Sequence, residues 1–209
     1  MRRKSFDILV SFGGLLIAVV LLAAGALAMW GYSYDNSTVY HQLSAQDITF
    51  PPASAFAHAK AGTEITPSMI PSVSQYAGQK LTTGAQAEVY ANDFIAVHLS
   101  EMPYHGVYAL ISSAARAAKP GTAQAAKLAA LEQTSFQGTS LRGMLLNAYG
   151  WWEIGQVALV AGIVSFCLAG ITILLSALGL WHARRVPAEE EIPRLHPAGA
   201  LGGELGASA

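Results

Sequence analysis

The chain has few charged residues and almost no cysteine. Asp, Glu, Lys and Arg make up only 12% of its 209 residues, whereas an ordinary soluble domain has roughly a quarter. The single cysteine, Cys167, excludes an intramolecular disulfide, so any domain outside a membrane must hold together by packing alone. The 12 Lys and Arg are balanced by 13 acids and form no basic patch, so we expect no binding to nucleic acid.

Motifs of common enzymes are also missing. No serine stands in a G-x-S-x-G turn, which is the usual setting of a hydrolase nucleophile. The glycines between 199 and 203 precede no predicted helix, so they do not form a phosphate-binding loop. We therefore expect a protein that is not an enzyme and that needs no cofactor.

Two long apolar runs account for most of the 53% of hydrophobic residues. The first, Ile8 to Met29, contains no charge and reaches roughly 33 Å as a helix, enough to cross a hydrocarbon core of about 30 Å. The second, Ile154 to Leu180, reaches about 40 Å and therefore has to tilt or project beyond the lipid. We predict transmembrane helices at residues 8–30 and 153–181.

A cleaved signal peptide is the alternative interpretation of the first run. Arg2, Arg3 and Lys4 resemble the basic start of such a peptide, and Ala26-Leu27-Ala28 resembles a cleavage site. The apolar part of a signal peptide is about 7 to 15 residues long, and this run is longer. Its length favours a retained span, while the sequence leaves open whether the span is ever cleaved.

The orientation follows from the charges at the ends of the two runs. Lys and Arg precede the first run and follow the second at Arg184 and Arg185, whereas Asp35 and Glu153 flank the other two ends. Because Lys and Arg are retained on the cytoplasmic side, we expect a two-pass protein of the plasma membrane with both termini cytoplasmic. The expected parts are a cytoplasmic N-terminus at 1–7, the span at 8–30, an extracytoplasmic helical domain at 31–152, the span at 153–181 and a disordered cytoplasmic tail at 182–209.

Small residues recur at short spacing in both runs. Gly14 and Ala18 lie four residues apart in the first, and Ala161, Ser165 and Ala169 follow the same spacing in the second. Such residues let two helix backbones approach closely, so we predict that they are helix-packing positions. Chance in an alanine-rich chain is the alternative, and the sequence does not choose between the two.

The region between the spans has helical patterns and no alternating strand pattern. The first span is expected to continue outward until Phe50-Pro51-Pro52, because proline cannot donate the helical hydrogen bond. A capped helix is predicted from Thr83 to Met102, and further helices are predicted at 106–119, at 122–133 and from residue 140 into the second span. The predicted fold class is all-α, with two antiparallel transmembrane helices extended into a small extracytoplasmic helical bundle.

The tail is rich in Gly and Pro and has an acidic run at 189–191. This composition is typical of disorder. A sensor coupled to a cytoplasmic kinase is therefore disfavoured.

Three side chains are the best candidates for a metal site. His98, Glu101 and His105 follow a spacing that would place them on one face of a continuous helix, and histidine with carboxylate suits zinc or iron. Pro103 interrupts that helix between the second and third candidates. In the alternative interpretation His98 packs beside Phe94, while the other two cap a solvated turn.

Several short segments resemble a family of uncharacterised actinobacterial two-span membrane proteins. They are MRRKSFD at 1–7, FPP at 50–52, YAGQ at 76–79, NDFIAVHL at 92–99 and LRGMLLNAY at 141–149. The resemblance covers residues 1 to about 185 and implies an external helical region and a plasma-membrane location. Members of that family sometimes carry the label of an aromatic ring-opening dioxygenase, an activity that needs iron held by His and carboxylate. The only such set in this sequence is the interrupted one at 98–105, so we do not transfer the activity.

We expect a non-catalytic accessory or scaffolding protein that binds other membrane or envelope proteins. Its partners would be the lipid bilayer and either a second membrane protein or further copies of itself. The alternative is an extracytoplasmic module that binds a small molecule or a metal ion.

Overall fold

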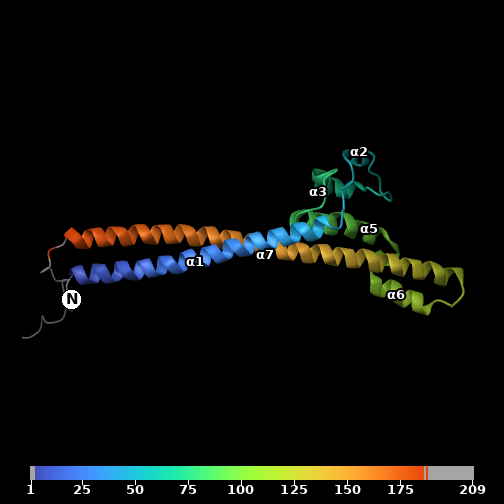
Figure 1. Ribbon diagram of the computed structural model, residues 1–209. Helices are drawn as coiled ribbons and strands as arrows, with labels where there is room; N and C mark the ends of the chain where they lie inside the picture. The colour runs from blue at the N-terminus through green and yellow to red at the C-terminus, as the bar shows by residue number, and fades with distance from the viewer. Residues whose placement is uncertain (1–2, 186, 188–209) are drawn as a thin grey trace, which may run out of the picture. The chain divides into compact units, whose positions relative to one another are not determined.

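The computed structural model describes residues 3–185 and 187, and this part of the chain is all-α (Figure 1). The elements are α1 (Arg3–Ser44), α2 (Ala53–Phe56), η1 (Pro67–Met69), α3 (Ile70–Val73), η2 (Ser74–Tyr76), α4 (Gly84–Val89), η3 (Tyr90–Ile95), α5 (Ala96–Glu101), η4 (Pro103–Gly106), α6 (Tyr108–Ala117) and α7 (Ala123–Arg185). The predicted disordered tail falls mostly on residues 186 and 188–209, outside the described residues. The described residues divide into two compact units, one made of residues 3–24 and 164–185 and one made of residues 25–163.

The helices α1 and α7 are both long and apolar enough to cross a membrane. The helix α7 is continuous, so the predicted break between residues 133 and 140 is wrong. No proline lies in that stretch, and the lone Gly138 costs a helix only about 1 kcal/mol. The absence of a side chain at Gly138 makes room for Leu99, because a Cβ at position 138 would lie 2.8 Å from Leu99 Cδ2. The helix also extends to Arg185, four residues beyond the predicted end of the span.

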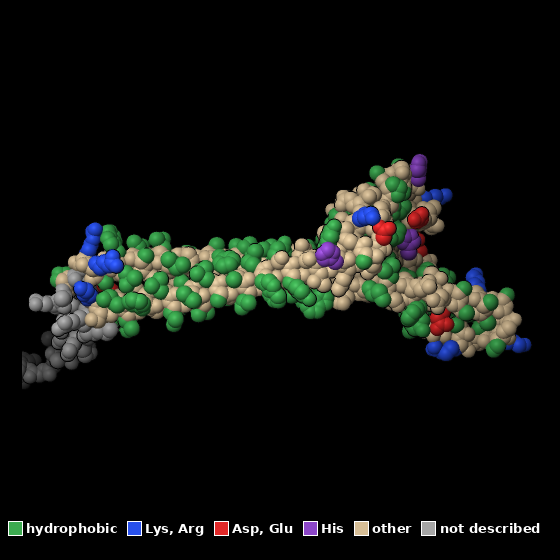
Figure 2. Space-filling view, viewed as in Figure 1, with side chains coloured by type: hydrophobic (Ala, Val, Ile, Leu, Met, Phe, Trp, Pro, Cys, Tyr) green, Lys and Arg blue, Asp and Glu red, His purple; other side chains and the backbone are tan. Residues whose placement is uncertain are grey.

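The first unit contains the N-terminal part of α1 and the C-terminal part of α7. Large apolar side chains cover its surface (Figure 2), with Leu16 69% and Leu175 62% exposed. Small residues are buried between the two helices, among them Ala18 and Ala169 at 1% and 0% exposure. A pair of helices that is apolar outside and packed through small residues inside is suited to a lipid environment.

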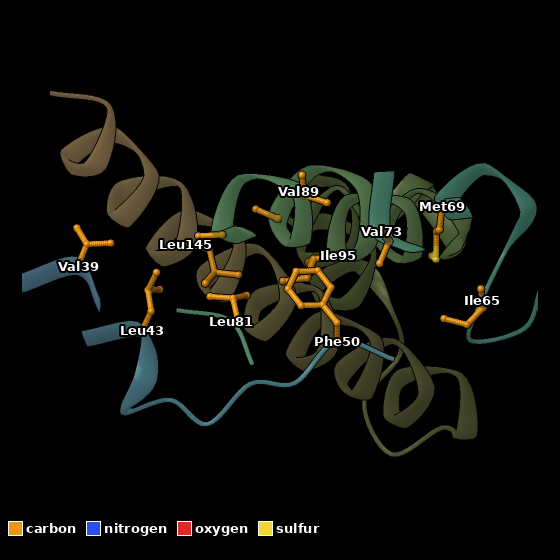
Figure 3. Packing of buried hydrophobic residues seen from close by; sticks show 12 residues of the cluster. Val39, Leu43, Phe50, Ile65, Met69, Val73, Leu81, Val89, Ile95 and Leu145 are labelled. Atoms are coloured by element: carbon orange, nitrogen blue, oxygen red, sulfur yellow. The ribbon is translucent and has the colours of Figure 1, made fainter. Parts of the chain in front are cut away.

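The second unit has its own hydrophobic core (Figure 3). The core brings α1 and α7 together with the short helices between them. Its buried members are Val39, Leu43, Phe50, Ile65, Met69, Val73, Leu81, Ala87, Val89, Ala91, Ile95 and Leu145. Because Val39, Leu43 and Leu145 belong to the two long helices, the core of the second unit is built directly on them.

Phe50 occupies the centre of this core at the point where α1 has ended. It is 1% exposed, and its ring centroid lies 5.2 Å from both Tyr76 and Tyr90. The chain enters this position through an isolated antiparallel bridge between Thr49 and Lys80. The helix α1 ends at Ser44, before the predicted stop at 50–52. Phe50 instead anchors the chain after the helix, because its aromatic ring is buried.

An ion pair lies beside the bridge. Lys80 Nζ donates to Asp47 Oδ1 at 2.6 Å, and this hydrogen bond, with the charge of Lys80, lowers the pKa of Asp47 below its usual 3.8. Both side chains are well exposed. The contact therefore fixes the local turn and adds little to the stability of the fold.

The predicted cap at Thr83 is confirmed. Thr83 Oγ1 accepts a hydrogen bond from the Gln86 backbone, and the Gln86 side chain accepts one from the Thr83 backbone. The helix that follows differs from the prediction, because Tyr90–Ile95 form a π-helical segment between α4 and α5. Segments of this kind change the direction of the following side chains and occur frequently at functional sites.

Candidate functional site

The three candidate metal ligands do not come together. Among the described residues no group of three or more His, Cys, Asp or Glu side chains is arranged to hold a metal ion. The helix ends at Glu101, and Tyr104, His105 and Gly106 all have positive φ angles. The backbone therefore turns away before His105, which lies exposed at the turn together with Glu101.

His98 has a role in holding the second unit together. Its Nδ1 lies 2.9 Å from the carbonyl oxygen of Phe94, and its Nε2 lies 2.8 Å from the carbonyl oxygen of Glu64. The imidazole also packs edge-on against the Phe94 ring, with centroids 4.6 Å apart. Both ring nitrogens face hydrogen-bond acceptors, so His98 links the 60–65 loop to α5.

The packing residues predicted in the spans are placed differently from one another. Gly14 faces α7, where a Cβ would overlap the Ser176 hydroxyl, and Ala18 and Ala169 are buried between the helices. Ser165 is partly buried, whereas Ala161 lies exposed. The buried positions of α7 in this unit, Ala169, Ser176 and Ala183, recur every seven residues, which is the period of two helices packed side by side.

Ser11 and Gly179 repeat the arrangement of Ser176 and Gly14. A Cβ on Gly179 would overlap the Ser11 hydroxyl, just as one on Gly14 would overlap that of Ser176. Each helix therefore contributes one serine and, three residues further along the chain, one glycine. This reciprocal packing of hydroxyl groups against bare backbone is a close contact that the four-residue spacing in the sequence did not indicate.

The second unit continues the close packing of α1 on α7. At Gly162 a Cβ would lie 3.0 Å from Met29 Sδ and 3.4 Å from the carbonyl oxygen of Gly25, and at Gly155 it would lie 3.4 Å from Asp35 Cβ. Gly155 and Gly162 are again seven residues apart. These glycines are thus used for packing within the chain itself.

A groove runs between α1 and α7 where both helices continue beyond their apolar stretches. It has a volume of about 530 Å³ and is lined by six residues of α1, by Gln46 in the turn after α1, and by four residues of α7. These are Tyr34, Asp35, Thr38, Val39, Gln42, Leu43, Gln46, Met144, Asn147, Ala148 and Trp151. All of them belong to the second unit.

The groove has a buried apolar floor and an exposed apolar rim. Val39 and Leu43 are 2% and 1% exposed, whereas Tyr34, Met144 and Trp151 are 60%, 63% and 55% exposed. The α1 residues that line the groove follow one face of the helix from position 34 to position 43, a length of about 14 Å, and Gln46 in the following turn adds to the lining. The shape is therefore long, and its rim displays three large apolar side chains outside the predicted spans.

Polar groups occur along the same groove. The amides Gln42, Gln46 and Asn147 make no side-chain hydrogen bond to any described residue, and Asp35 is the one charged side chain in the lining. The nearby Arg142 is engaged elsewhere, since its Nη2 donates to Asn92 Oδ1 at 2.8 Å. The groove thus offers one negative charge and several free amide groups to an occupant.

The sequence did not indicate this groove. Its α1 wall was predicted as an outward helix and its α7 wall as the helix leading into the second span, but which faces meet depends on the tertiary packing. The only available signal was the exposed pair of aromatic residues Tyr34 and Trp151, which were assigned to the membrane interface, where Tyr and Trp are enriched.

Comparison of the chain with protein-family models, with curated proteins and with solved structures gives no match. The function has to be argued from the residues.

Proposed function

We propose that this chain is a non-catalytic accessory or scaffolding protein of the plasma membrane that binds another membrane or envelope protein. It would cross the membrane twice, with both termini in the cytoplasm. The observation that carries the proposal is the groove between α1 and α7, whose rim exposes Tyr34, Met144 and Trp151. Exposed apolar side chains gathered along a groove are typical of a surface that another molecule covers.

The small-residue faces of the two helices do not support partner binding in the same way. Gly14, Ser176 and their neighbours pack against each other inside the chain, so they hold the hairpin together. The groove is a better candidate for the partner surface, because its rim is open and its amides have no partner within the described residues.

The size of the expected effect follows from Trp151. Its side chain is 55% exposed, which corresponds to roughly 140 Å² of a total near 250 Å². At about 25 cal/mol per Å², covering that area contributes about 3 kcal/mol. Part of this gain is offset by the ordering of side chains on binding, so we expect Trp151→Ala to weaken the partner about 10- to 100-fold.

Co-purification from native membranes in a mild detergent tests the proposal. The tagged full chain should retain a protein at constant ratio, and Trp151→Ala should lose it. The matched control is Trp181→Ala, because Trp181 has nearly the same exposure, 53%, and does not line the groove. A monomer without any co-purifying protein, or equal loss with both variants, would argue against a scaffolding role.

The extracytoplasmic small-molecule module is the second candidate. The groove volume, about 530 Å³, lies within the range of roughly 300–1,000 Å³ that is usual for small-molecule sites. Native mass spectrometry of the same preparations separates the two functions. A small molecule that disappears with Trp151→Ala, with no co-purifying protein, would favour the module.

A further inference from the structure

We infer that the occupant of the groove is a helix of a second membrane protein, one that leaves the bilayer beside α1 and carries a Lys or Arg at the level of Asp35. This inference rests on the proposed function and names its partner. It is argued from the position, the length and the charge of the groove.

The position places one end of the groove at the membrane surface. Tyr34 lies five residues beyond Met29, the last residue of the first apolar run, and Trp151 lies three residues before Ile154, the first residue of the second. Tyrosine and tryptophan are enriched at the level of the lipid headgroups. From Tyr34 and Trp151 the groove leads away from the bilayer to Gln46, so an occupant that fills it emerges from the membrane alongside α1.

The length fits a helix. The lining of α1 covers residues 34 to 43, nearly three turns and about 14 Å, with Val39 and Leu43 forming an apolar floor. A groove between two packed helices accepts an amphipathic third helix through apolar side chains spaced three and four residues apart. A compact small molecule would fill only part of that length.

The charge identifies a feature of the partner. Asp35 is the one charged lining residue and is partly buried, and no Lys, Arg or His lines the groove with it. Covering a carboxylate without a cation is costly, so the occupant has to bring a positive charge to the membrane end of the groove. Lys and Arg are less frequent on the outer side of membrane proteins than on the cytoplasmic side. A Lys or Arg just outside the span therefore distinguishes the expected partner from most other membrane proteins.

Photo-crosslinking in the native membrane tests the inference on the full chain. A photoreactive residue at Tyr34 should capture a second membrane protein, and the captured peptide should lie within about ten residues of an apolar span and contain a Lys or Arg. Asp35→Asn should lower the yield at least fivefold, because it removes the charge and keeps the shape. The matched control is Glu153→Gln, a carboxylate on α7 that does not line the groove and that should leave the yield unchanged.

The outcomes separate the inference from the proposed function. A captured protein whose peptide is far from any span, or a yield that Asp35→Asn leaves unchanged, overturns the inference while partner binding stands. Capture of lipid alone, of a second copy of this chain or of nothing overturns the inference as well. In that case co-purification with the Trp151 variants still decides the proposed function by itself.

Discussion

Substitution of Gly84 by alanine should loosen the second unit at the point where α4 begins. Gly84 is buried against α7, and a methyl group there would lie 2.8 Å from Trp152 Cδ2 and closer still to Trp152 Cγ and Cβ. The Trp152 Cβ is attached directly to the backbone of α7, so rotation of the side chain does not remove this overlap. The helix α4 has to shift away from α7.

The magnitude follows from two opposing terms. Overpacking of a close contact costs typically 1–3 kcal/mol, and a contact next to the backbone belongs at the upper end of that range. Alanine in place of glycine returns up to about 1 kcal/mol of helix propensity. The net loss is about 2 kcal/mol, which increases the population of locally open α4 about 30-fold.

Hydrogen exchange on the full chain in lipid nanodiscs measures this local opening. The backbone amides of α4 and η3 should exchange about 30-fold faster in Gly84→Ala. The matched control is Gly143→Ala on α7, where a Cβ would meet nothing within 4 Å, and exchange there should be unchanged or slower. Equal exchange in Gly84→Ala and the parent chain would refute the packing of α4 on Trp152.

Three further predictions concern other contacts. Gly14→Ala should lower the thermal unfolding midpoint in detergent, and adding Ser176→Ala to the same chain should restore it. Without the Ser176 hydroxyl, the nearest atom of residue 176 to the new Cβ is its own Cβ at 3.6 Å, an ordinary contact distance. A double variant as unstable as Gly14→Ala would contradict the reciprocal packing. Burial, with a smaller contribution from the charge of Glu64, raises the pKa of Tyr90 above its usual 10.0. The neutral phenol therefore contributes fully to the free energy of unfolding below pH 10, and this contribution is lost as the pH rises through the raised pKa. Denaturation followed at alkaline pH should show the loss of stability, and Tyr90→Phe should abolish this pH dependence. Because the pKa of Asp47 is lowered, the ion pair with Lys80 is complete above pH 3.8, the usual pKa of the carboxyl group, and is lost as the pH falls through the lowered pKa. An NMR titration of the Asp47 carboxyl should show a midpoint below 3.8 that moves upward in Lys80→Ala.

Much of the fold could be predicted from local patterns. The prolines at positions 51 and 52 placed the end of the first helix too late, because α1 already ends at Ser44. The apolar runs correctly indicated α1 and α7, and Thr83 with Gln86 indicated the start of α4. These features act over a few residues, so they are visible in the sequence. The uninterrupted α7 was missed because glycine at position 138 was interpreted as a break, whereas its contact with Leu99 compensates for the loss of helix propensity.

The candidate site depended on contacts between distant segments. His98 was considered as a metal ligand by its spacing from Glu101, but its hydrogen bond to the carbonyl oxygen of Glu64 joins residues 34 positions apart. The groove likewise joins residues 34–46 to residues 144–151. No local pattern determines which faces of two long helices meet, so neither feature could be read from the sequence.

Position-specific photo-crosslinking tests the central claim, that the groove binds a membrane partner, most directly. The same photoreactive residue is placed at Tyr34, which lines the groove, or at Tyr40, which lies on the same helix with 51% exposure and does not line it. The account predicts a crosslinked second membrane protein from position 34 and at least tenfold less from position 40. Equal yields from the two positions, or the same partner captured only from position 40, would contradict it.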